Sequence, residues 1–488
     1  MKLPNLPIIF YRNDYFCAMS RKNTDKLVFY NIKVTDAGAK GVSVAKAPDG
    51  KVIFITNAVP GDVVDVQTFK KRKAYYEGKV IKIHEFSEFR VDPPCIHFGI
   101  CGGCKWQNME YRQQLNFKHN EVYNQLKRIG KVDLPEFEPI LGSEKQYFYR
   151  NKMEFSFSDS RWLTEDEIGS DGEIDNRNAL GFHIPKMWDK ILDIQKCHLQ
   201  EDPSNAIRNS LREFAKANNL EFFNPRHHSG LLRTMMIRTA STGEIMVLIQ
   251  FFDDKPLEIE QVMQFLSDSF PQITSLLYVI NQKPNDTLYD QEIILYKGRD
   301  FILEEMEGLQ FSISAKSFYQ TNSEQAYRLY SIARDFAGLT GNETVYDLYT
   351  GTGTIAQFVS RNAKKVVGVE AVPQAIEDAR ENAKRNNITN CEFLVGDMKD
   401  VFNDDFLKVH GKPDVIITDP PRDGMHKDVV DQLLRIGAPK IVYVSCNAAT
   451  QARDLAILDE KYKVERVRPV DMFPQTHHVE NVVLLTKR

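Results

Sequence analysis

The stretch that decides the fold is residues 344–354, which read TVYDLYTGTGT. Its first five residues form the apolar run of a buried strand. The glycines that follow allow a backbone to pass close to a ligand where a strand turns into a helix. From about residue 318 onwards, further short apolar runs alternate with helical segments. This alternation is typical of a doubly wound parallel sheet, so residues 315–488 are predicted to form a Rossmann-like α/β domain.

The same pattern places the other elements of this domain. Further buried strands are expected at 365–369, 391–395, 414–418 and 440–444, with helices such as 373–386 and 427–437 between them. Two later strand-like runs, 463–470 and 481–485, lie near the end of the chain. They are predicted to form an antiparallel pair at the edge of the sheet.

Two carboxylates near strand ends indicate what kind of ligand the glycine loop binds. Glu370 ends the second strand, about twenty residues after Asp347, where a carboxylate can accept hydrogen bonds from both hydroxyls of a ribose. Asp397 follows the third strand, near the expected position of an adenine. A dinucleotide-binding loop would carry a third glycine, but Thr354 stands at that place. The loop therefore favours a single adenosine ligand, such as S-adenosylmethionine, over a dinucleotide.

Three further segments carry reactive side chains near strand ends. The motif DPPR at 419–422 is either a stiff turn beside a reaction centre or a simple strand-terminating turn. Cys446 follows the fifth strand, where it is a candidate nucleophile as the thiolate, or else an ordinary buried thiol. Glu480 follows two histidines and precedes the last strand. It is a candidate base if burial raises its pKa, and otherwise a solvated carboxylate.

The amino-terminal part reads as a small all-β unit over residues 28–86. Five short strand-like runs, separated by turns that contain Pro and Gly, predict a barrel of the OB type. The segment from Lys70 to Lys73 reads KKRK and is followed by Tyr75 and Tyr76. Cations can pair with phosphates, and both rings can stack on bases, so this segment is a candidate RNA contact. The alternative is a solvated hairpin tip.

Taken together, these segments resemble the motifs of RNA 5-methyluridine methyltransferases. In chain order the motifs are FYQTN at 318–322, DLYTGTGT at 347–354, DPPR at 419–422, SCN at 445–447 and HVE at 478–480. The chain is most similar to the branch with an amino-terminal TRAM barrel and an iron–sulfur cluster, known chiefly from 23S ribosomal RNA uracil-5 methyltransferases. The resemblance extends from about residue 28 to 488.

The resemblance implies a role for each matching residue. The residues that would contact S-adenosylmethionine are Gln320, Tyr349, Glu370 and Asp419. Cys446 would be the nucleophile that adds to C6 of the uracil, and Glu480 would be the base that removes the C5 proton. Arg422 is a candidate donor to the uracil carbonyls. Two positions depart from the family pattern, since Thr354 replaces the Asn of some members and Ala448 replaces the Pro of Ser-Cys-Asn-Pro.

The cysteines suggest a metal centre. Seven cysteines without a disulfide pattern or a secretory signal predict a reducing cytoplasm, where thiols stay free or bind metal. The candidate ligands are Cys95, Cys101, Cys104 and Cys197. The first three lie on one Gly-rich loop, and the fourth matches the distant ligand of the family. Four thiolates suit either zinc or a [4Fe–4S] cluster, and the resemblance favours the cluster. Cys17 and Cys391 belong to no motif and are expected to be ordinary residues.

Three domains are expected from these patterns. They are the barrel at 28–86, a central α+β domain at 87–314 and the methyltransferase domain at 315–488. The central domain would contain the cysteine loop and a helix at 106–129 that packs on the C-terminal domain. An acidic insert at 165–175 is predicted to be an exposed loop.

Composition narrows the class of protein. The chain has 488 residues, of which 42% are hydrophobic and 27% charged, as is typical of a soluble multidomain protein. No run approaches the ~18 apolar residues of a membrane span. The net charge of −4 does not mark a nucleic-acid binder, so RNA binding must depend on local clusters. Without a heptad pattern or an exposed apolar stripe, the expected state is a monomer.

RNA is the expected partner, with ribosomal RNA favoured and transfer RNA as the alternative. Two other functions stay open on the sequence. One is a methyltransferase for a nucleobase nitrogen or a protein amide, which would need neither Cys446 nor Glu480. The other is a non-catalytic RNA-binding protein with a degenerate methyltransferase domain, which the intact motifs oppose.

Overall fold

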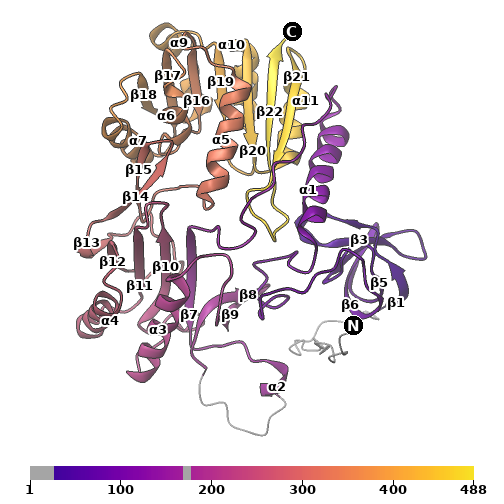
Figure 1. The fold of residues 1–488 in the computed structure, drawn as a ribbon, viewed down its shortest axis with the longest axis vertical. Helices are drawn as coiled ribbons and strands as arrows, with labels where there is room; N and C mark the ends of the chain where they lie inside the picture. The colour runs from indigo at the N-terminus through magenta and orange to yellow at the C-terminus, as the bar shows by residue number, and fades with distance from the viewer. Residues whose placement is uncertain (1–26, 169–176) are drawn as a thin grey trace, which may run out of the picture. The chain divides into compact units, whose positions relative to one another are not determined.

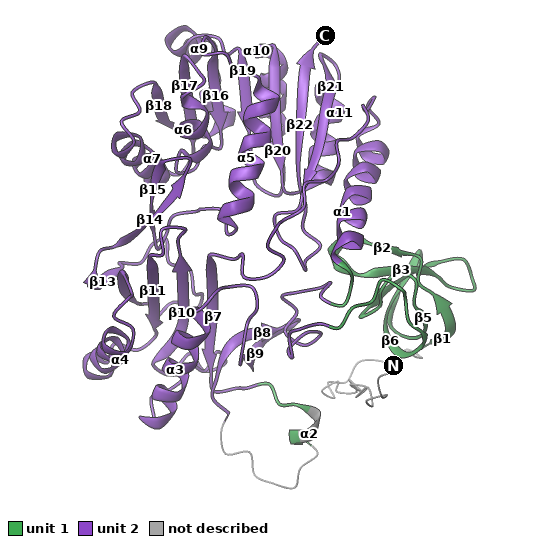
Figure 2. Cartoon of the chain, viewed as in Figure 1, with its two compact units in different colours: residues 1–92, 108–110, 162–176 green, residues 93–107, 111–161, 177–488 purple. Residues whose placement is uncertain are grey.

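The computed structural model describes residues 27–168 and 177–488. Within these ranges, two compact units make up the chain (Figure 2). One contains residues 27–92, 108–110 and 162–168, and the other contains residues 93–107, 111–161 and 177–488. Cys17 and residues 169–175 of the acidic insert lie outside the described residues. In the described part of the chain, no helix is long and apolar enough to cross a membrane.

The first unit is a six-stranded sheet with the strand order β1-β5-β6-β4-β3-β2. Its strands are β1 (Val28–Lys33), β2 (Asp36–Ala37), β3 (Ser43–Lys46), β4 (Val52–Thr56), β5 (Val63–Lys71) and β6 (Tyr75–Glu85). Alternate residues point inwards and bury an apolar core that includes Ile53, Ile55, Val64 and Val66. The small β unit is therefore confirmed, and the two-residue β2 adds a strand to the five that were predicted.

The second unit contains the predicted doubly wound sheet, here called the C-terminal sheet. Its strand order is β18-β17-β16-β19-β20-β22-β21 (Figure 1). The parallel strands are β16 (Thr344–Leu348), β17 (Lys365–Glu370), β18 (Cys391–Val395), β19 (Val415–Thr418) and β20 (Lys440–Ser445). Antiparallel β22 (Glu480–Lys487) lies between β20 and β21 (Tyr462–Val470), as predicted for the edge pair. The carboxyl ends of the parallel strands and the amino end of β22 thus meet at one edge.

Helices cover both faces of the C-terminal sheet. One face packs against α5 (Ser323–Ala337), α6 (Thr354–Ser360) and α7 (Pro373–Arg385). The other face packs against α8 (Met398–Val401), α9 (Asp404–His410), α10 (Lys427–Ile436) and α11 (Ala448–Leu458). Each helix turns its apolar stripe inwards, as Val429, Val430 and Leu433 do on α10. The sheet is therefore buried between two apolar layers, which is what a parallel sheet requires.

A second sheet, here called the central sheet, precedes it in the chain, with the order β13-β12-β11-β10-β7-β8-β9. Its strands are β7 (Lys152–Ser158), β8 (Ala179–Ile184), β9 (Met187–Asp193), β10 (Leu232–Thr239), β11 (Ile245–Phe251), β12 (Ser275–Ile280) and β13 (Ile294–Gly298). One face packs against α3 (Ser204–Ala217) and α4 (Pro256–Ser269). A separate hairpin follows, made of β14 (Phe301–Met306) and β15 (Leu309–Ser314).

One apolar core connects the central sheet to the C-terminal sheet. It contains Met236 and Leu248 of the central sheet, Phe311 of the hairpin and Leu329 of α5. The two sheets therefore belong to a single packed unit, although the sequence suggested a domain boundary near residue 314.

Two elements differ from the sequence-based expectation. The helix expected at 106–129 begins later, because α1 spans Tyr111–Gln125 and a π-helical turn follows from Leu126 to Gly130. Residues 106–110 are not helical because the two groups that would form the first helical hydrogen bond are used elsewhere: Glu110 N donates to Phe89 O at 2.8 Å, and Trp106 O accepts from Gln114 Nε2 at 3.0 Å. In the acidic insert, the short helix α2 (Glu165–Ile168) stands where a loop was expected.

Candidate active site

Cys446 and Glu480 lie on neighbouring strands at one edge of the C-terminal sheet. Cys446 directly follows β20, and Glu480 is the first residue of β22. Ser445 pairs with Asn481 across these strands, so the next residue on each side, Cys446 or Glu480, lies at the same strand end. Cys446 is half-buried, and Glu480 is only 5% exposed. The structure therefore brings together the two residues that the sequence singled out as nucleophile and base.

Burial and neighbouring carboxyl groups raise the pKa values of both Cys446 and Glu480. Burial, with the nearby carboxyls of Glu480 and Asp419, raises the pKa of Cys446 to about 11. Burial and Asp419 also raise the pKa of Glu480 to about 8. Arg422 opposes both shifts, because a guanidinium stabilises a thiolate and a carboxylate. A cationic ligand bound here would act in the same direction as Arg422.

Asp347 anchors the glycine loop from within the core. Its side chain is fully buried, and Oδ2 accepts hydrogen bonds from Thr350 Oγ1 at 2.5 Å and from Ala356 N at 3.0 Å. Burial raises the pKa of Asp347 to about 7, and the nearby Glu370 contributes in the same direction. Through Oδ2, Asp347 therefore holds both ends of the loop.

The loop itself turns through left-handed backbone conformations. Tyr349 has φ 63°, Gly351 has φ 55° and Gly353 has φ 76°. A Cβ atom at Gly353 would lie 2.9 Å from Ala379 Cβ and from the ring of Phe393, so no side chain fits there. A Cβ atom at Gly351 would meet nothing within 4 Å. Gly353 thus permits close packing of α6, whereas Gly351 makes a turn that leaves open space beside the loop.

The two predicted nucleoside-binding acids lie at the ends of β17 and β18. Glu370 accepts hydrogen bonds from Gly351 N at 3.2 Å and from Val372 N at 3.0 Å, so its carboxylate faces the glycine loop. Asp397 caps α8 and forms an ion pair with Lys399 Nζ at 3.1 Å. The hydrogen bonds from Lys399 lower the pKa of Asp397, which keeps it ionised. Both carboxylates are therefore available as acceptors at this edge.

Tyr330 lies near two further candidate residues, Gln320 and Asp419. The sequence did not single out this tyrosine. It is buried on α5, and its hydroxyl hydrogen-bonds with the side chain of Gln320. The carboxyls of Asp419, Asp347 and Glu480 act electrostatically on the same hydroxyl. Burial and Asp347 raise the pKa of Asp419 to about 7. The signal for Tyr330 was its position two turns into the helix that follows the FYQTN motif.

The loop that carries Arg422 is fixed by the first turn of α11. Arg422 O accepts hydrogen bonds from Asn447 Nδ2 at 2.9 Å and from Thr450 Oγ1 at 3.2 Å. The Arg422 side chain is exposed at the strand ends. Because Asn447 follows Cys446 directly, one short motif supplies the thiol and also fixes the backbone of the arginine.

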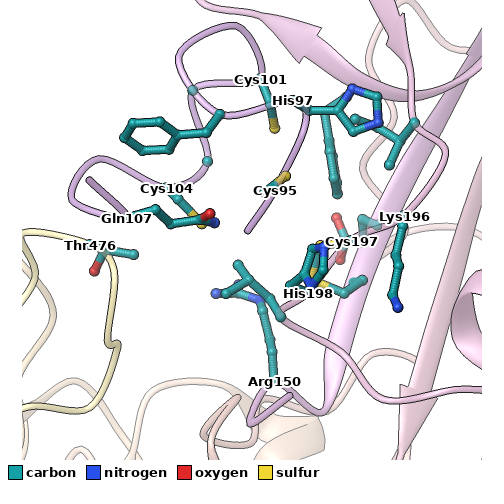
Figure 3. A pocket seen from close by; sticks show the side chains of 18 of the residues that line it. Cys95, His97, Cys101, Cys104, Gln107, Arg150, Lys196, Cys197, His198 and Thr476 are labelled. Atoms are coloured by element: carbon teal, nitrogen blue, oxygen red, sulfur yellow. The ribbon is translucent and has the colours of Figure 1, made fainter. Parts of the chain in front are cut away.

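The four candidate ligand cysteines line one cavity of about 590 Å³ (Figure 3). They are Cys95, Cys101, Cys104 and Cys197. The first three lie on the loop before α1, and the fourth lies between β9 and α3. His97 Nε2 accepts a hydrogen bond from Gln195 N at 3.0 Å, which connects the two loops. Cys197 N donates to Asn205 Oδ1 at 2.8 Å, so the first turn of α3 fixes the fourth cysteine.

The chemistry of this donor set can be compared with two kinds of metal centre. Burial raises the pKa of Cys101 to about 11 and that of Cys104 to about 12, so both thiols are protonated at neutral pH, and a bound cation would favour their thiolate forms. A single tetrahedral zinc ion would need sulfur atoms about 3.8 Å apart. In the described part of the chain, no three His, Cys, Asp or Glu side chains are gathered closely enough for one ion. The four thiols line one cavity but are not arranged around a single ion in this structure.

In the first unit, the KKRK segment covers the last two residues of β5 and the start of the turn that leads to β6. Its exposed cations are Lys71, Arg72 and Lys73. Lys70 Nζ instead forms an ion pair with Glu77 Oε1 at 2.6 Å. The prediction that both tyrosine rings are available for base stacking is wrong for Tyr76, which is 3% exposed and donates its hydroxyl to Asp49 Oδ2 at 2.8 Å. Strand alternation directs this ring into the core, away from its neighbour Tyr75.

Known proteins match this chain over nearly its whole length. The TRAM domain model matches residues 29–81, and the tRNA (uracil-5-)-methyltransferase model matches residues 289–488. Two relatives described as uncharacterized RNA methyltransferases come from Bacteroides thetaiotaomicron and Porphyromonas gingivalis. The first is 58% identical over 92% of this chain and 100% of its own length. The second is 54% identical over 93% of this chain and 99% of its own length.

A solved structure matches as well. The crystal structure of Pyrococcus abyssi tRNA (uracil-54, C5)-methyltransferase in complex with S-adenosyl-L-homocysteine is 27% identical in sequence, with a TM-score of 0.72. The match covers 93% of this chain and 100% of that one. These similarities confirm the predicted α/β fold with its TRAM-like strands. This chain belongs to the family of S-adenosylmethionine-dependent RNA uracil-5 methyltransferases.

Proposed function

We propose that this enzyme methylates C5 of a specific uridine in ribosomal RNA through a covalent bond between Cys446 and C6 of the uracil. The observation that carries the proposal is the adjacency of Cys446 and Glu480 at the ends of β20 and β22. A methyltransferase for a nitrogen atom needs no such pair, because its target atom is already a nucleophile. C5 of uracil is a poor nucleophile and needs activation.

Each step of the proposed reaction conserves atoms and electrons. The thiolate of Cys446 adds to C6, and the electron pair of the C5–C6 double bond moves to form an enolate. C5 then attacks the methyl carbon of S-adenosylmethionine as its carbon–sulfur bond breaks. Glu480 takes the C5 proton, the double bond forms again, and Cys446 leaves as a thiolate. The target base must be unstacked to reach these groups.

The order of proton transfers follows from the raised pKa values. Cys446 must lose its thiol proton before attack, and Glu480 must be ionised when the C5 proton is removed. Because one carboxylate cannot hold both protons, the thiol proton must pass to solvent before the last step. Arg422 is proposed to donate to the uracil carbonyl and stabilise the enolate, since it already stabilises negative charge on both groups.

The residues proposed to contact S-adenosylmethionine are Gln320, Tyr349, Glu370 and Asp419. Glu370 supports this assignment because its carboxylate faces the open space beside Gly351, where a ribose can bind. Asp419 has a raised pKa in a buried acidic cluster, so a sulfonium cation beside it would favour its ionised form. Gln320 is held by the buried hydroxyl of Tyr330.

The cysteine cavity is proposed to hold a [4Fe–4S] cluster, with zinc as the alternative. The ligands would be Cys95, Cys101, Cys104 and Cys197, which line one cavity. When bound, the cluster would supply a rigid cross-link between two loops and no electron, because methyl transfer is redox-neutral. Arg150, Lys152 and Lys196 line the same cavity and would offset the negative charge of four thiolates.

Ribosomal RNA is proposed as the substrate because the chain combines TRAM-like strands with the four cysteines. Transfer RNA is the second candidate, since the Pyrococcus abyssi relative is a transfer RNA methyltransferase. Mapping 5-methyluridine in both RNA classes from a strain that lacks this protein separates the two. Loss of a ribosomal site supports the proposal, and loss of a transfer RNA site alone selects the second candidate.

The chemistry can be tested on RNA from the same strain. Uridine tritiated at C5 is incorporated into this RNA, and tritium release is measured beside methyl incorporation from S-adenosylmethionine. Only C5 chemistry expels that hydrogen, so both signals should rise together. Methyl incorporation without tritium release would reject uracil C5 as the target atom.

A further inference from the structure

The loop before Glu480 depends on contacts from outside itself. It comprises residues 471–479, closes the hairpin between β21 and β22, and is here called the base loop. Val470 and Glu480 are the last paired residues at its two ends. Glu480 is the residue at which this loop joins β22, so the loop sets how the chain enters the strand at the proposed base.

Five successive carbonyl groups of the base loop, from Asp471 to Gln475, each accept a hydrogen bond from a donor outside the loop. In chain order of the acceptors, the donors are Gln325 Nε2, Asn322 Nδ2, Lys118 Nζ, Tyr149 OH, and the backbone N–H groups of Lys105 and Trp106. They belong to α5 and the residue that caps it, to α1, to the segment before β7 and to the end of the cysteine loop. Buried carbonyls must be paired, so these segments determine the shape of the loop.

A buried ion pair forms the centre of these contacts. Lys118 Nζ lies 2.6 Å from Asp471 Oδ1, and both side chains are completely buried. Tyr111 OH donates to Asp471 Oδ2 at 2.8 Å, and Phe473 N donates to Asp471 Oδ1 at 3.0 Å. A buried charge without its partner is strongly unfavourable. The start of the base loop is therefore fixed against α1.

A second contact fixes the far part of the base loop. Gln114 and Gln475 form reciprocal hydrogen bonds, in which Gln475 N donates to Gln114 Oε1 at 3.0 Å and Gln114 Nε2 donates to Gln475 Oε1 at 3.0 Å. Gln475 adopts φ 66°, a conformation that a glutamine keeps only when its surroundings impose it. Both contacts come from α1, so one helix holds the base loop at two points.

We propose that Lys118, Asp471 and Tyr111 are positioning residues that hold Glu480 in place for removal of the C5 proton. The inference depends on the proposed role of Glu480 as base. Cys446 follows β20, outside the base loop, so the proposal assigns these residues to proton removal and not to attack or methyl transfer. A displaced base loop slows proton removal selectively, and a shift of about 1 Å at a catalytic group can cost up to about 100-fold in rate.

The test uses the full-length enzyme with Tyr111→Phe and Lys118→Met. The matched control is Tyr462→Phe, which removes a buried hydroxyl that donates to Ala438 O at 2.9 Å from the opposite end of β21. Single turnovers are run with total RNA from a strain that lacks the protein and with methyl-labelled S-adenosylmethionine. A denaturing gel then separates the methylated covalent adduct from released RNA.

Both α1 variants should release methylated RNA more slowly, by about tenfold or more, while labelled adduct accumulates. Tyr462→Phe should release it at the wild-type rate without extra adduct. A release rate for Tyr111→Phe equal to that of wild type would overturn the proposal, even if Lys118→Met fails to fold. A variant that loses activity without accumulating adduct would also overturn it, because general destabilisation gives that result.

A second substrate distinguishes a failure of the positioning role from a failure of the proposed covalent mechanism. RNA containing 5-fluorouridine cannot complete the last step, because fluorine is not removed as a cation by a base. Adduct formation on this RNA therefore reports only attack and methyl transfer, and both α1 variants should form it at the wild-type rate. Slower adduct formation would contradict a role confined to proton removal. If wild-type protein forms no adduct on this RNA, the covalent route itself is wrong.

Discussion

Ser445 at the end of β20 pairs with Asn481 on β22, which places Cys446 and Glu480 side by side at the edge of the C-terminal sheet. The relationship requires an antiparallel strand next to the last parallel one. In such a pair, the end of one strand lies beside the start of the other. A nucleophile and a base from distant parts of the chain can therefore meet without a long loop.

Cys446→Ala should abolish methylation while leaving S-adenosylmethionine binding intact. Removal of a nucleophile typically costs about 10³-fold or more in rate. The proposed cofactor contacts come from other segments of the chain, so binding measured by calorimetry should be unchanged. Residual methylation within about tenfold of wild type would remove Cys446 as the nucleophile.

Glu480→Gln should trap the enzyme on its RNA. Attack by Cys446 and methyl transfer both precede proton removal, so this variant should accumulate a covalent protein–RNA adduct. The adduct is measured as a slowly migrating band on a denaturing gel that contains label from the methyl group. Cys446→Ala/Glu480→Gln is the control and should give no band. Normal turnover by Glu480→Gln would show that another group is the base.

The raised pKa of Glu480 predicts a pH-dependent stability difference. The folded protein holds this proton up to a pKa of about 8, whereas an ordinary glutamate loses it near 4.5. The folded state therefore binds the proton more tightly than the unfolded chain, and this group contributes less stability as pH rises between these values. The Glu480→Gln side chain stays neutral at every pH, so this variant does not lose stability in this way.

The Tm of ligand-free Glu480→Gln minus that of wild type should thus be larger at about pH 8.5 than at about pH 5. Exposed Glu460→Gln is the control and should show no such change. A difference in Tm that stays constant with pH would mean that the Glu480 carboxyl is not held neutral by burial.

The parallel strands were predictable from the sequence, whereas contacts between distant segments were not. The strands 344–348 and 391–395 have the expected bounds, because parallel strands buried on both faces read as continuous apolar runs. The start of α1 was misplaced because Glu110 N, which would have paired with Trp106 O in the expected helix, donates to Phe89 O instead. No local pattern signals such a partner.

In the candidate site, too, residues in local motifs were predictable and residues that meet only through folding were not. Cys446 and Glu480 were found because they belong to motifs at strand ends. Lys118 and Asp471 were not found, since a lysine on a helix and an aspartate in a loop are ordinary surface residues until folding buries them together. Tyr76 was misread because a sequence of adjacent tyrosines does not say which ring faces the core.

The exposed cations of the β5–β6 turn are predicted to contact RNA phosphates. Changing Lys71, Arg72 and Lys73 together to Ser should weaken RNA binding. The slope of log affinity against log salt concentration should also become shallower by up to about 2 units. Each phosphate contact that is lost removes the counterion release that the contact had caused. Lys70→Ser is the control and should have a smaller effect, because Glu77 already pairs with that lysine. A triple variant with an unchanged salt slope would place the phosphate contacts elsewhere.

Protein purified without oxygen should be brown and contain about four irons per chain, as expected for a [4Fe–4S] cluster. Cys101→Ser should lose iron, because its thiol lines the cavity that the other three candidate ligands share. It should also loosen the cysteine loop, since metal binding in such a loop is coupled to its folding. Limited proteolysis would show this as new cleavage between residues 95 and 104.

Cys391→Ser provides the matched control. Cys391 is a half-buried free thiol on β18, and its Sγ lies 3.7 Å from Ala356 O, away from the cysteine cavity. This variant should keep all of its iron and its resistance to proteolysis. Iron retained in full by Cys101→Ser would reject that residue as a ligand. Stoichiometric zinc in wild-type protein purified without oxygen would replace the cluster with a single-ion site, and the four sulfur atoms would then have to close around it.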